Sequence, residues 1–453
     1  KNGGTSLEVV VVTAVAPVAV ACIQIVQLVL KRHAAPYSFL LNFVMVTWPL
    51  YCCFVLPECA GHIILGLIAS TFLIAAVGGV RVRDSGEAIK DLTVALNLPR
   101  KAFVTAYRGT MMLATCIAIL AVDFPSFPRR FAKTETFGVS VMDAGVGSVL
   151  LTQAMVAPVT RHSTVGAPQR VQSALLSASP LLLLGGVRIA GTVAADYHTH
   201  VSEYGVHWNF FFTLAVVSIV GNALPLQGLQ AAIGAIAMSA AYQYALSTTG
   251  LQDYILSATR VDLLSANREG VFGCVGYCAV FFSGVALGKV IFTKVARTAS
   301  SCLFLCVSLF VGAALLWAGV AVLEEYGLHV SRRMVNLPYV VWTMAYNTLI
   351  LALFLAAEVL VHFIEIPGKK RGGTILSARQ YYSESCQMLC DAVNRNLLAV
   401  FLASNLMTGA TNIFLPTLTA TWTQGFITMS LYSLAVTCLA AELNRRNLTL
   451  KFW

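Results

Sequence analysis

Long apolar runs separated by short polar connections extend from one end of this chain to the other. Runs of roughly 18–25 apolar residues, which as helices cross about 30 Å of hydrocarbon, recur throughout the sequence. About thirteen can be counted, near residues 7–30, 38–57, 61–80, 103–122, 137–158, 172–194, 208–226, 228–247, 270–292, 300–322, 338–363, 396–416 and 421–441. The connections are too short for a soluble domain, and a helix satisfies its own backbone hydrogen bonds in lipid. The pattern predicts a single all-α, multi-pass membrane domain over residues 1–453, with about thirteen transmembrane helices in one bundle.

Composition supports the membrane assignment. Apolar residues make up 58% of the chain and charged residues 11%, with a mean hydropathy of +0.77. A net charge of +10 would suit nucleic-acid binding if the cations formed one basic face, but they are spread over short connections. We therefore expect membrane lipids, and no nucleic acid, as partners. The twelve cysteines and eight histidines lack the spacing of zinc ligands, so no metal site is expected.

The positive residues collect mainly on alternate connections, as the positive-inside rule describes for cytosolic loops. With thirteen spans, this bias predicts a non-cytosolic N-terminus and a cytosolic C-terminus. Five cations depart from the rule and fall on the non-cytosolic side: Arg129, Arg130, Lys133, Arg332 and Arg333. Cations that oppose the topology rule are candidates for a functional role.

Three of these cations belong to one segment, from Asp123 to Gly138, between two apolar runs. It reads Asp-Phe-Pro-Ser-Phe-Pro-Arg-Arg-Phe-Ala-Lys-Thr-Glu-Thr-Phe-Gly and combines two prolines, three cations and two acids. So many charges at a membrane edge indicate a site that handles a polar substrate. The alternative is a connector whose cations extend to lipid headgroups.

Other polar residues lie within or beside the apolar runs. Arg108, Asp143 and Arg188 fall inside or near the ends of spans, where charges are costly and often functional. Asp143 is expected either to form a structural ion pair with Arg108 or Arg188, or to act in the site directly. Mixed polar and aromatic blocks at span edges add further candidates, which are His207, Trp208, Asn209, Asn267, Glu269, Arg332, Arg333 and the 394–396 block. Three of these blocks share a side with Asp123 and Lys133, which suggests a common polar cavity; the alternative for each is boundary anchoring by interfacial aromatic residues.

These motifs together resemble a known family. The block at 123–136 is followed by Met142-Asp143 with Gly145 and Gly147, and then by further matching blocks in the same order, at 203–212, 267–270, 331–334 and 451–453. The set is similar to the glucosaminyl-phosphatidylinositol inositol acyltransferases of GPI-anchor biosynthesis, the PIG-W family. The similarity covers essentially the whole chain. The connections after Arg32 and Lys369 are shorter than the family pattern.

The resemblance implies a multi-pass enzyme of the endoplasmic reticulum membrane. In that membrane the non-cytosolic N-terminus predicted from the charge bias is lumenal. The implied reaction moves a fatty acyl group, typically palmitoyl, from acyl-CoA to the inositol 2-hydroxyl of glucosaminyl-phosphatidylinositol. Asp123 and Lys133 match the family's favoured catalytic pair. Acyl-CoA would act as co-substrate, with no permanently bound cofactor and no obligate protein partner.

The residue types suit that chemistry. Attack of a hydroxyl on a thioester needs a base near the hydroxyl and a positive group where the thioester oxygen gains charge. Arg129 and Arg130 would bind substrate phosphates, a task that suits guanidinium groups. The remaining alternatives are a secondary transporter or another membrane enzyme that acts on lipid-linked sugars. The odd number of spans and the lack of an evident internal repeat argue against a transporter.

Overall fold

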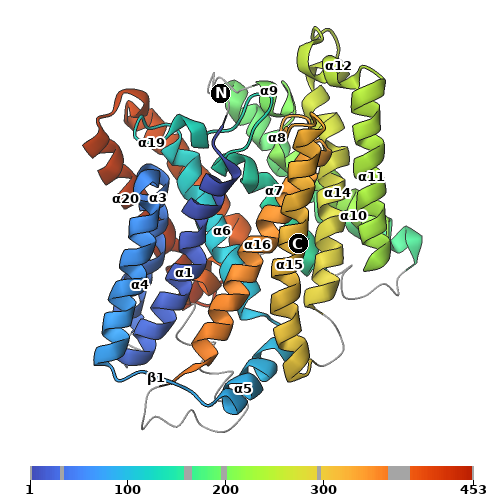
Figure 1. The fold of residues 1–453 in the computed structure, drawn as a ribbon. Coiled ribbons are helices and arrows are strands. Elements are labelled where there is room, and N and C mark those ends of the chain that lie inside the picture. Colours follow the sequence, from blue (N-terminus) through green and yellow to red (C-terminus); the bar gives the residue numbers. More distant parts are fainter. Residues whose placement is uncertain are drawn as a thin grey trace.

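A computed structural model describes residues 3–30, 35–157, 166–194, 201–292, 297–365 and 388–450, and most of this part of the chain is helical (Figure 1). The helices are α1 (Ser6–Leu30), α2 (Ala35–Asn42), α3 (Trp48–Val55), α4 (Ala60–Val77), α5 (Ser85–Asn97), α6 (Ala102–Ala121), α7 (Val141–Val156), α8 (Ala167–Ala194), α9 (Val201–Tyr204), α10 (Phe210–Ala223), α11 (Leu229–Thr248), α12 (Leu251–Ser257), α13 (Leu263–Ala266), α14 (Arg268–Ile291), α15 (Ala299–Glu325), α16 (Leu337–His362), α18 (Met388–Arg395), α19 (Leu397–Phe414) and α20 (Trp422–Arg445). Two short strands, β1 (Arg81–Val82) and β2 (Ile364–Glu365), pair antiparallel with Arg81 opposite Glu365.

The prediction of an all-α, multi-pass membrane protein is confirmed. Ten helical stretches in the described residues are long and apolar enough to cross a membrane. One of them, Ser38–Val55, continues from α2 to α3 through the π-helical turn Phe43–Thr47. The helices α7 and α10 are apolar but shorter, and α11 has 20 residues. The count of thirteen spans stays a prediction.

The centre of the bundle is formed by α6, α7, α14 and α16. In this group α7 and α16 contact each other, and both contact α6 and α14. Small residues allow the closest of these approaches. A Cβ added to Gly288 of α14 would lie 2.4 Å from the carbonyl oxygen of Met155 on α7, so only glycine fits there. Apolar side chains on the outer helices remain exposed, as expected where lipid covers the surface; examples are Phe72, Leu183, Ile236, Leu315 and Ile413.

The two ends of the bundle differ. The N-terminal residues, α9 and α12 lie at one end, while α5 and β1 lie at the other (Figure 1). The main-chain N–H of Gly4 donates to the carbonyl oxygen of Val139 at 2.9 Å, so the charged segment 123–138 lies at the same end as the start of α1. At the opposite end Asp84 caps α5 by accepting from Gly86 and Glu87. The end that carries α9 and segment 123–138 is called the polar end below.

Candidate active site

The charged segment after α6 is held in place by its own aromatic residues. Phe124, Phe127 and Phe131 are each no more than 1% exposed, and they anchor the segment in the bundle. A 3-10 turn over Arg129–Phe131 follows Pro128. The buried phenylalanines therefore hold the backbone of the segment in place, while the polar side chains of Asp123, Arg129 and Lys133 line a cavity.

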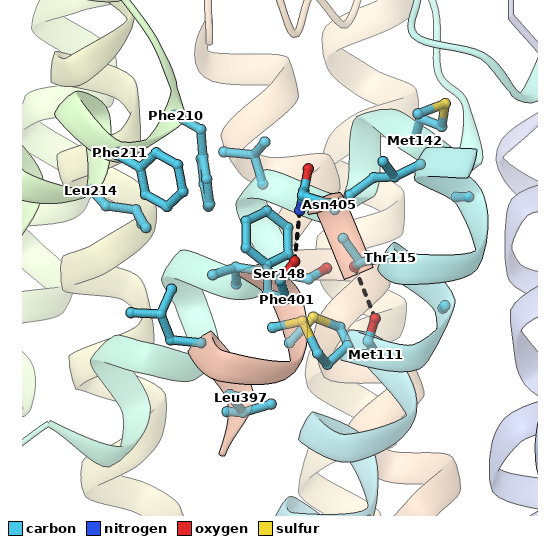
Figure 2. Close-up of a pocket in the computed structure, with 18 of the residues that line it drawn as sticks. Met111, Thr115, Met142, Ser148, Phe210, Phe211, Leu214, Leu397, Phe401 and Asn405 are labelled. Carbon is cyan, nitrogen blue, oxygen red and sulfur yellow. Dashed lines mark hydrogen bonds between the residues drawn. The ribbon is translucent and has the colours of Figure 1, made fainter. Parts of the chain in front are cut away.

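A cavity of about 1680 Å³ extends through the bundle between α6, α7, α8, α10 and α19. Its lining at the polar end includes Asp123, Arg129, Lys133, Arg188, Glu203 and Arg332. Its middle is mainly apolar, with Met111 on α6, Leu214 on α10 and Phe401 on α19 facing the same space (Figure 2). The far end is lined by Arg108, Arg395, Asn396, Leu397 and Leu450. The cavity thus joins a charged end to a long apolar interior.

Asp123 lines the polar end and is held by an amide. The Nδ2 of Asn412 on α19 donates to Asp123 Oδ2 at 2.8 Å, and Thr417 Oγ1 donates to Asn412 Oδ1 at 3.0 Å, which fixes the amide's orientation. Burial raises the pKa of Asp123 above its ordinary value, against the opposing effects of the Asn412 hydrogen bond and the charges of Arg129 and Lys133. Sequence reasoning missed Asn412, although a polar residue at the end of an apolar span is a usable signal.

Lys133 lies in the same cavity, but its ion pair is with Glu203. Lys133 Nζ is 2.6 Å from Glu203 Oε1, and Arg332 also pairs with that oxygen at 3.4 Å. Burial acts to raise the pKa of Glu203, but the charges of Lys133 and Arg332 outweigh it and hold the pKa at about 2. The structure therefore places Asp123 and Lys133 in one cavity, with Glu203 as the direct partner of the lysine. Glu203 was absent from the predicted site residues, although it opens the 203–212 block.

Asp143 continues this chain of charges away from the cavity. Its Oδ1 is 2.8 Å from Arg332 Nε, so the expected ion pair of Asp143 with Arg108 or Arg188 is wrong. Asp143 is 1% exposed and accepts hydrogen bonds from the hydroxyls of Ser140 and Thr134 at 2.8 and 2.9 Å. It is not among the residues that line the cavity. This arrangement favours the structural alternative for Asp143, as an anchor for Arg332.

The loop that carries Arg332 is held in a strained conformation. Val335 has φ 53°, an uncommon value for a β-branched residue, and such strain costs on the order of 1–3 kcal/mol. Asn336 compensates by accepting from the main-chain N–H of Ser331 at 3.0 Å and donating to His329 O at 2.8 Å. Gly276 of α14 completes the fit, since an added Cβ would lie 2.0 Å from Val335 O. The loop is thus shaped to hold Arg332 at one place.

Two other predicted residues line the cavity and also join helices. Trp208 Nε1 donates to Thr213 Oγ1 at 2.9 Å. Asn209 caps α10 and donates through Nδ2 to Gly185 O on α8 at 2.9 Å. Asn209 thus joins α8 to α10, while the Trp208 bond stays local to the start of α10. The contacts of both residues with substrate stay a prediction.

Six predicted residues, Asp143 among them, lie outside the cavity lining. For His207, Asn267, Glu269 and Arg333 the expected common polar cavity is therefore wrong. Arg130 pairs with Glu8 and Glu58, each at 2.7 Å, and ties the segment to the start of α1. His207 is exposed, and its main-chain N–H donates to the Oδ1 of Asn267 at 2.7 Å.

Glu269 and Arg333 form a separate cluster. The Glu269 carboxylate is fully buried and pairs with Arg260 at 2.6 Å and with Arg333 at 2.8 Å. Arg333 therefore turns away from the cavity, while the adjacent Arg332 faces it. Consecutive arginines could not be assigned to different clusters from sequence.

Comparisons with known proteins give a consistent family assignment. A family model described as GWT1 matches residues 1–443. A GPI-anchored wall transfer protein 1 from Gibberella zeae is 39% identical, over 78% of this chain and 75% of its own length. A protein of the same name from Aspergillus fumigatus is 35% identical, over 98% of this chain and 96% of its own. A Phosphatidylinositol-glycan biosynthesis class W protein from Dictyostelium discoideum is 31% identical, over 92% and 88%.

Proposed function

We propose that this chain, which belongs to the GWT1 family, acts in GPI-anchor biosynthesis as a membrane O-acyltransferase. It transfers a fatty acyl group, palmitoyl in the first instance, from acyl-CoA to the inositol 2-hydroxyl of glucosaminyl-phosphatidylinositol. Its place is the endoplasmic reticulum membrane. The names of the relatives support the pathway. The observation that carries the reaction is the cavity, because it joins a carboxylate and an ammonium group to an apolar interior.

Asp123 is the base in this proposal. It takes the proton of the inositol hydroxyl while the hydroxyl oxygen attacks the carbonyl carbon of the thioester. The new C–O bond forms, the C–S bond breaks, and CoA leaves as a thiolate. The proton held by Asp123 passes to this thiolate, which returns Asp123 to its ionised form. The raised pKa of Asp123 suits this role, since a base works best with a pKa nearer the operating pH.

Lys133 is the electrophilic group. Its ammonium stabilises the negative charge that develops on the thioester oxygen in the transition state. The ion pair with Glu203 at 2.6 Å fixes the ammonium in the cavity before substrate binds. Such preorganisation removes the cost of orienting the charge during the reaction.

The remaining cavity lining fits the other parts of the substrates. The apolar middle around Met111, Leu214 and Phe401 receives the acyl chain, at about 0.8 kcal/mol for each methylene that leaves water. Arg129 lines the polar end and has no carboxylate partner within 4 Å among the described residues. Its guanidinium therefore suits the inositol phosphate. No covalent acyl-enzyme is needed, and transfer is direct.

Release of free CoA thiol tests direct transfer. Purified protein with palmitoyl-CoA is expected to release CoA only when glucosaminyl-phosphatidylinositol is added. Asp123→Asn should reduce the acceptor-dependent rate by about 100-fold or more, the typical contribution of a positioned base. A burst of one CoA per protein without acceptor would indicate a covalent acyl-enzyme and contradict direct transfer. A near-normal rate for Asp123→Asn would contradict its role as the base.

A further inference from the structure

The far end of the cavity is built by the last residues of the described chain. After α20 ends at Arg445, the segment Asn447–Leu450 turns back toward the bundle, and Thr449 and Leu450 line the cavity. Asn447 has φ 56°, a left-handed conformation that asparagine tolerates better than most residues and that reverses the chain after a helix. This segment is called the C-terminal tail below.

Two residues at the joint between α18 and α19 hold the tail. Arg395 donates through Nε to Thr449 Oγ1 at 2.8 Å and through a terminal nitrogen to Asn447 O at 2.9 Å. Asn396 donates to Leu448 O at 3.0 Å and accepts from the N–H of Leu450 at 2.7 Å, as a neighbouring strand would. The hydrogen-bonding groups of Arg395 and Asn396 are therefore directed at the tail, which is fixed where α19 begins.

The distance from Asp123 to this end can be estimated along α6. Arg108 lines the far end, and the fifteen residue steps from Arg108 to Asp123 span about 22 Å at 1.5 Å per step. The helix α19 runs alongside in register. The hydroxyl of Tyr432 donates both to Cys116 O on α6, at 3.0 Å, and to Ser404 O on α19, at 3.3 Å, so these two residues lie at one level. Eight residues before Cys116 is Arg108, and eight residues before Ser404 is Asn396, which therefore lie at one level as well.

That length matches one acyl chain. An extended chain advances about 1.2 Å per bond, so the fifteen C–C bonds of a sixteen-carbon acyl group span about 18 Å. A reacting carbonyl about 3–4 Å from the base brings the total to about 22 Å. A longer chain would have to enter the space that the tail occupies.

We infer that the C-terminal tail, fixed by Arg395 and Asn396, is the floor of the acyl-chain site and sets the longest acyl group accepted. Leu450 is the specificity-determining residue, because its side chain lines the cavity while its main chain is bound by Asn396. This inference rests on the proposed function, since it assigns the cavity to an acyl donor. The ligand class is a saturated acyl thioester of about sixteen carbons.

The test measures the rate of acyl transfer for a series of saturated acyl-CoA donors whose chains run from 12 to 22 carbons. The unaltered protein should lose activity beyond sixteen carbons, by about fourfold for each methylene that no longer fits in the apolar site. Leu450→Ala should move this limit to longer donors by about two carbons, and Leu450→Trp should move it to shorter ones. Deletion of residues 447–453 should extend it to 20–22 carbons.

Leu448→Ala is the matched control. Leu448 is adjacent in the tail and about as exposed as Leu450, at 45% against 40%, but it does not line the cavity. It should keep the unaltered profile. If Leu450→Trp and the deletion each changed the rate by the same factor for every donor length, the tail would not set the longest acyl group, and the inference would be wrong.

Binding separates this inference from the proposed function. If the unaltered protein transfers no acyl group, the proposed function fails, and the same donors are then compared by the thermal stabilisation that they give. If the donor length that gives the greatest stabilisation is shorter in Leu450→Trp than in the unaltered protein, the tail limits the acyl-chain site as inferred. Equal stabilisation by 16- and 22-carbon donors in every variant overturns it.

Discussion

At the scale of single residues, the ionisation of Asp123 is set by opposing influences. Burial raises its pKa, while the amide of Asn412 and two nearby cations favour the charged form. A base has to be ionised, so the rate of transfer falls as pH drops through the raised pKa. The acid limb of the pH–rate profile should therefore lie above the value of about 3.9 typical of aspartate.

Removal of the Asn412 amide should move this limb. Asn412→Leu takes away the hydrogen bond to the carboxylate, which raises the pKa further and shifts the acid limb of kcat/KM to higher pH. Asn405→Leu is the control, because Asn405 lies two turns earlier on α19, lines the cavity and donates to Phe401 O. An unchanged acid limb in Asn412→Leu would remove Asn412 from the account.

Glu203 is the residue on which the position of Lys133 depends. Glu203→Gln keeps the shape but removes the charge that pairs with Lys133 at 2.6 Å and with Arg332 at 3.4 Å. We expect at least a tenfold loss of kcat with a smaller change in KM, because the ammonium is needed in the transition state. With Lys133→Ala already present, Glu203→Gln should cost much less, and additive losses in this double-mutant cycle would contradict the dependence.

At the scale of elements, the Arg332 loop depends on a close approach to α14. Gly276→Ala would bring a methyl group to 2.0 Å from Val335 O, so the loop has to shift and Arg332 has to move from Glu203. Overpacking of this kind typically costs about 1–3 kcal/mol, and a lower Tm together with reduced transfer is expected. Gly312→Ala on α15 is the control, since no atom lies within 4 Å of its added Cβ. An unchanged Tm and rate in Gly276→Ala would show that the loop does not need this fit.

The sequence predicted the helices but not how they contact one another. The long apolar runs predicted the spanning helices, because a segment that crosses lipid has to be helical regardless of which helices pack beside it. They could not give the break at Asn396 or the partner of Asp143. The ion pair of Asp143 with Arg332 and the amide of Asn412 at Asp123 join residues far apart in sequence. Such pairs depend on how the helices pack, which a local pattern does not encode.

At the scale of the whole molecule, the side of the membrane that the polar end faces is the main structural expectation. Asn447-Leu-Thr449 is the one N-x-S/T sequon in the sequence. The charge bias places it in the cytosol, so we expect it to carry no glycan in cells. A sequon added to an extended 196–206 connection should be glycosylated; residues 195–200 lie outside the described part.

The structure links that engineered site to the reaction. Glu203 pairs with Lys133, so α9 and the proposed catalytic residues lie at one end of the bundle. Glycosylation of the engineered sequon would therefore place Asp123 and Lys133 on the lumenal side. A glycan on native Asn447 would reverse the assignment and place them in the cytosol.

The central claim is the transfer of one acyl group to the inositol ring, and tandem mass spectrometry of the lipid product tests it most directly. Purified protein, palmitoyl-CoA and glucosaminyl-phosphatidylinositol are expected to give a product heavier by one palmitoyl group, with fragments that place it on inositol. Asp123→Asn should give none above background. No mass gain with the unaltered protein, or a palmitoyl group found on the glucosamine, would contradict the account.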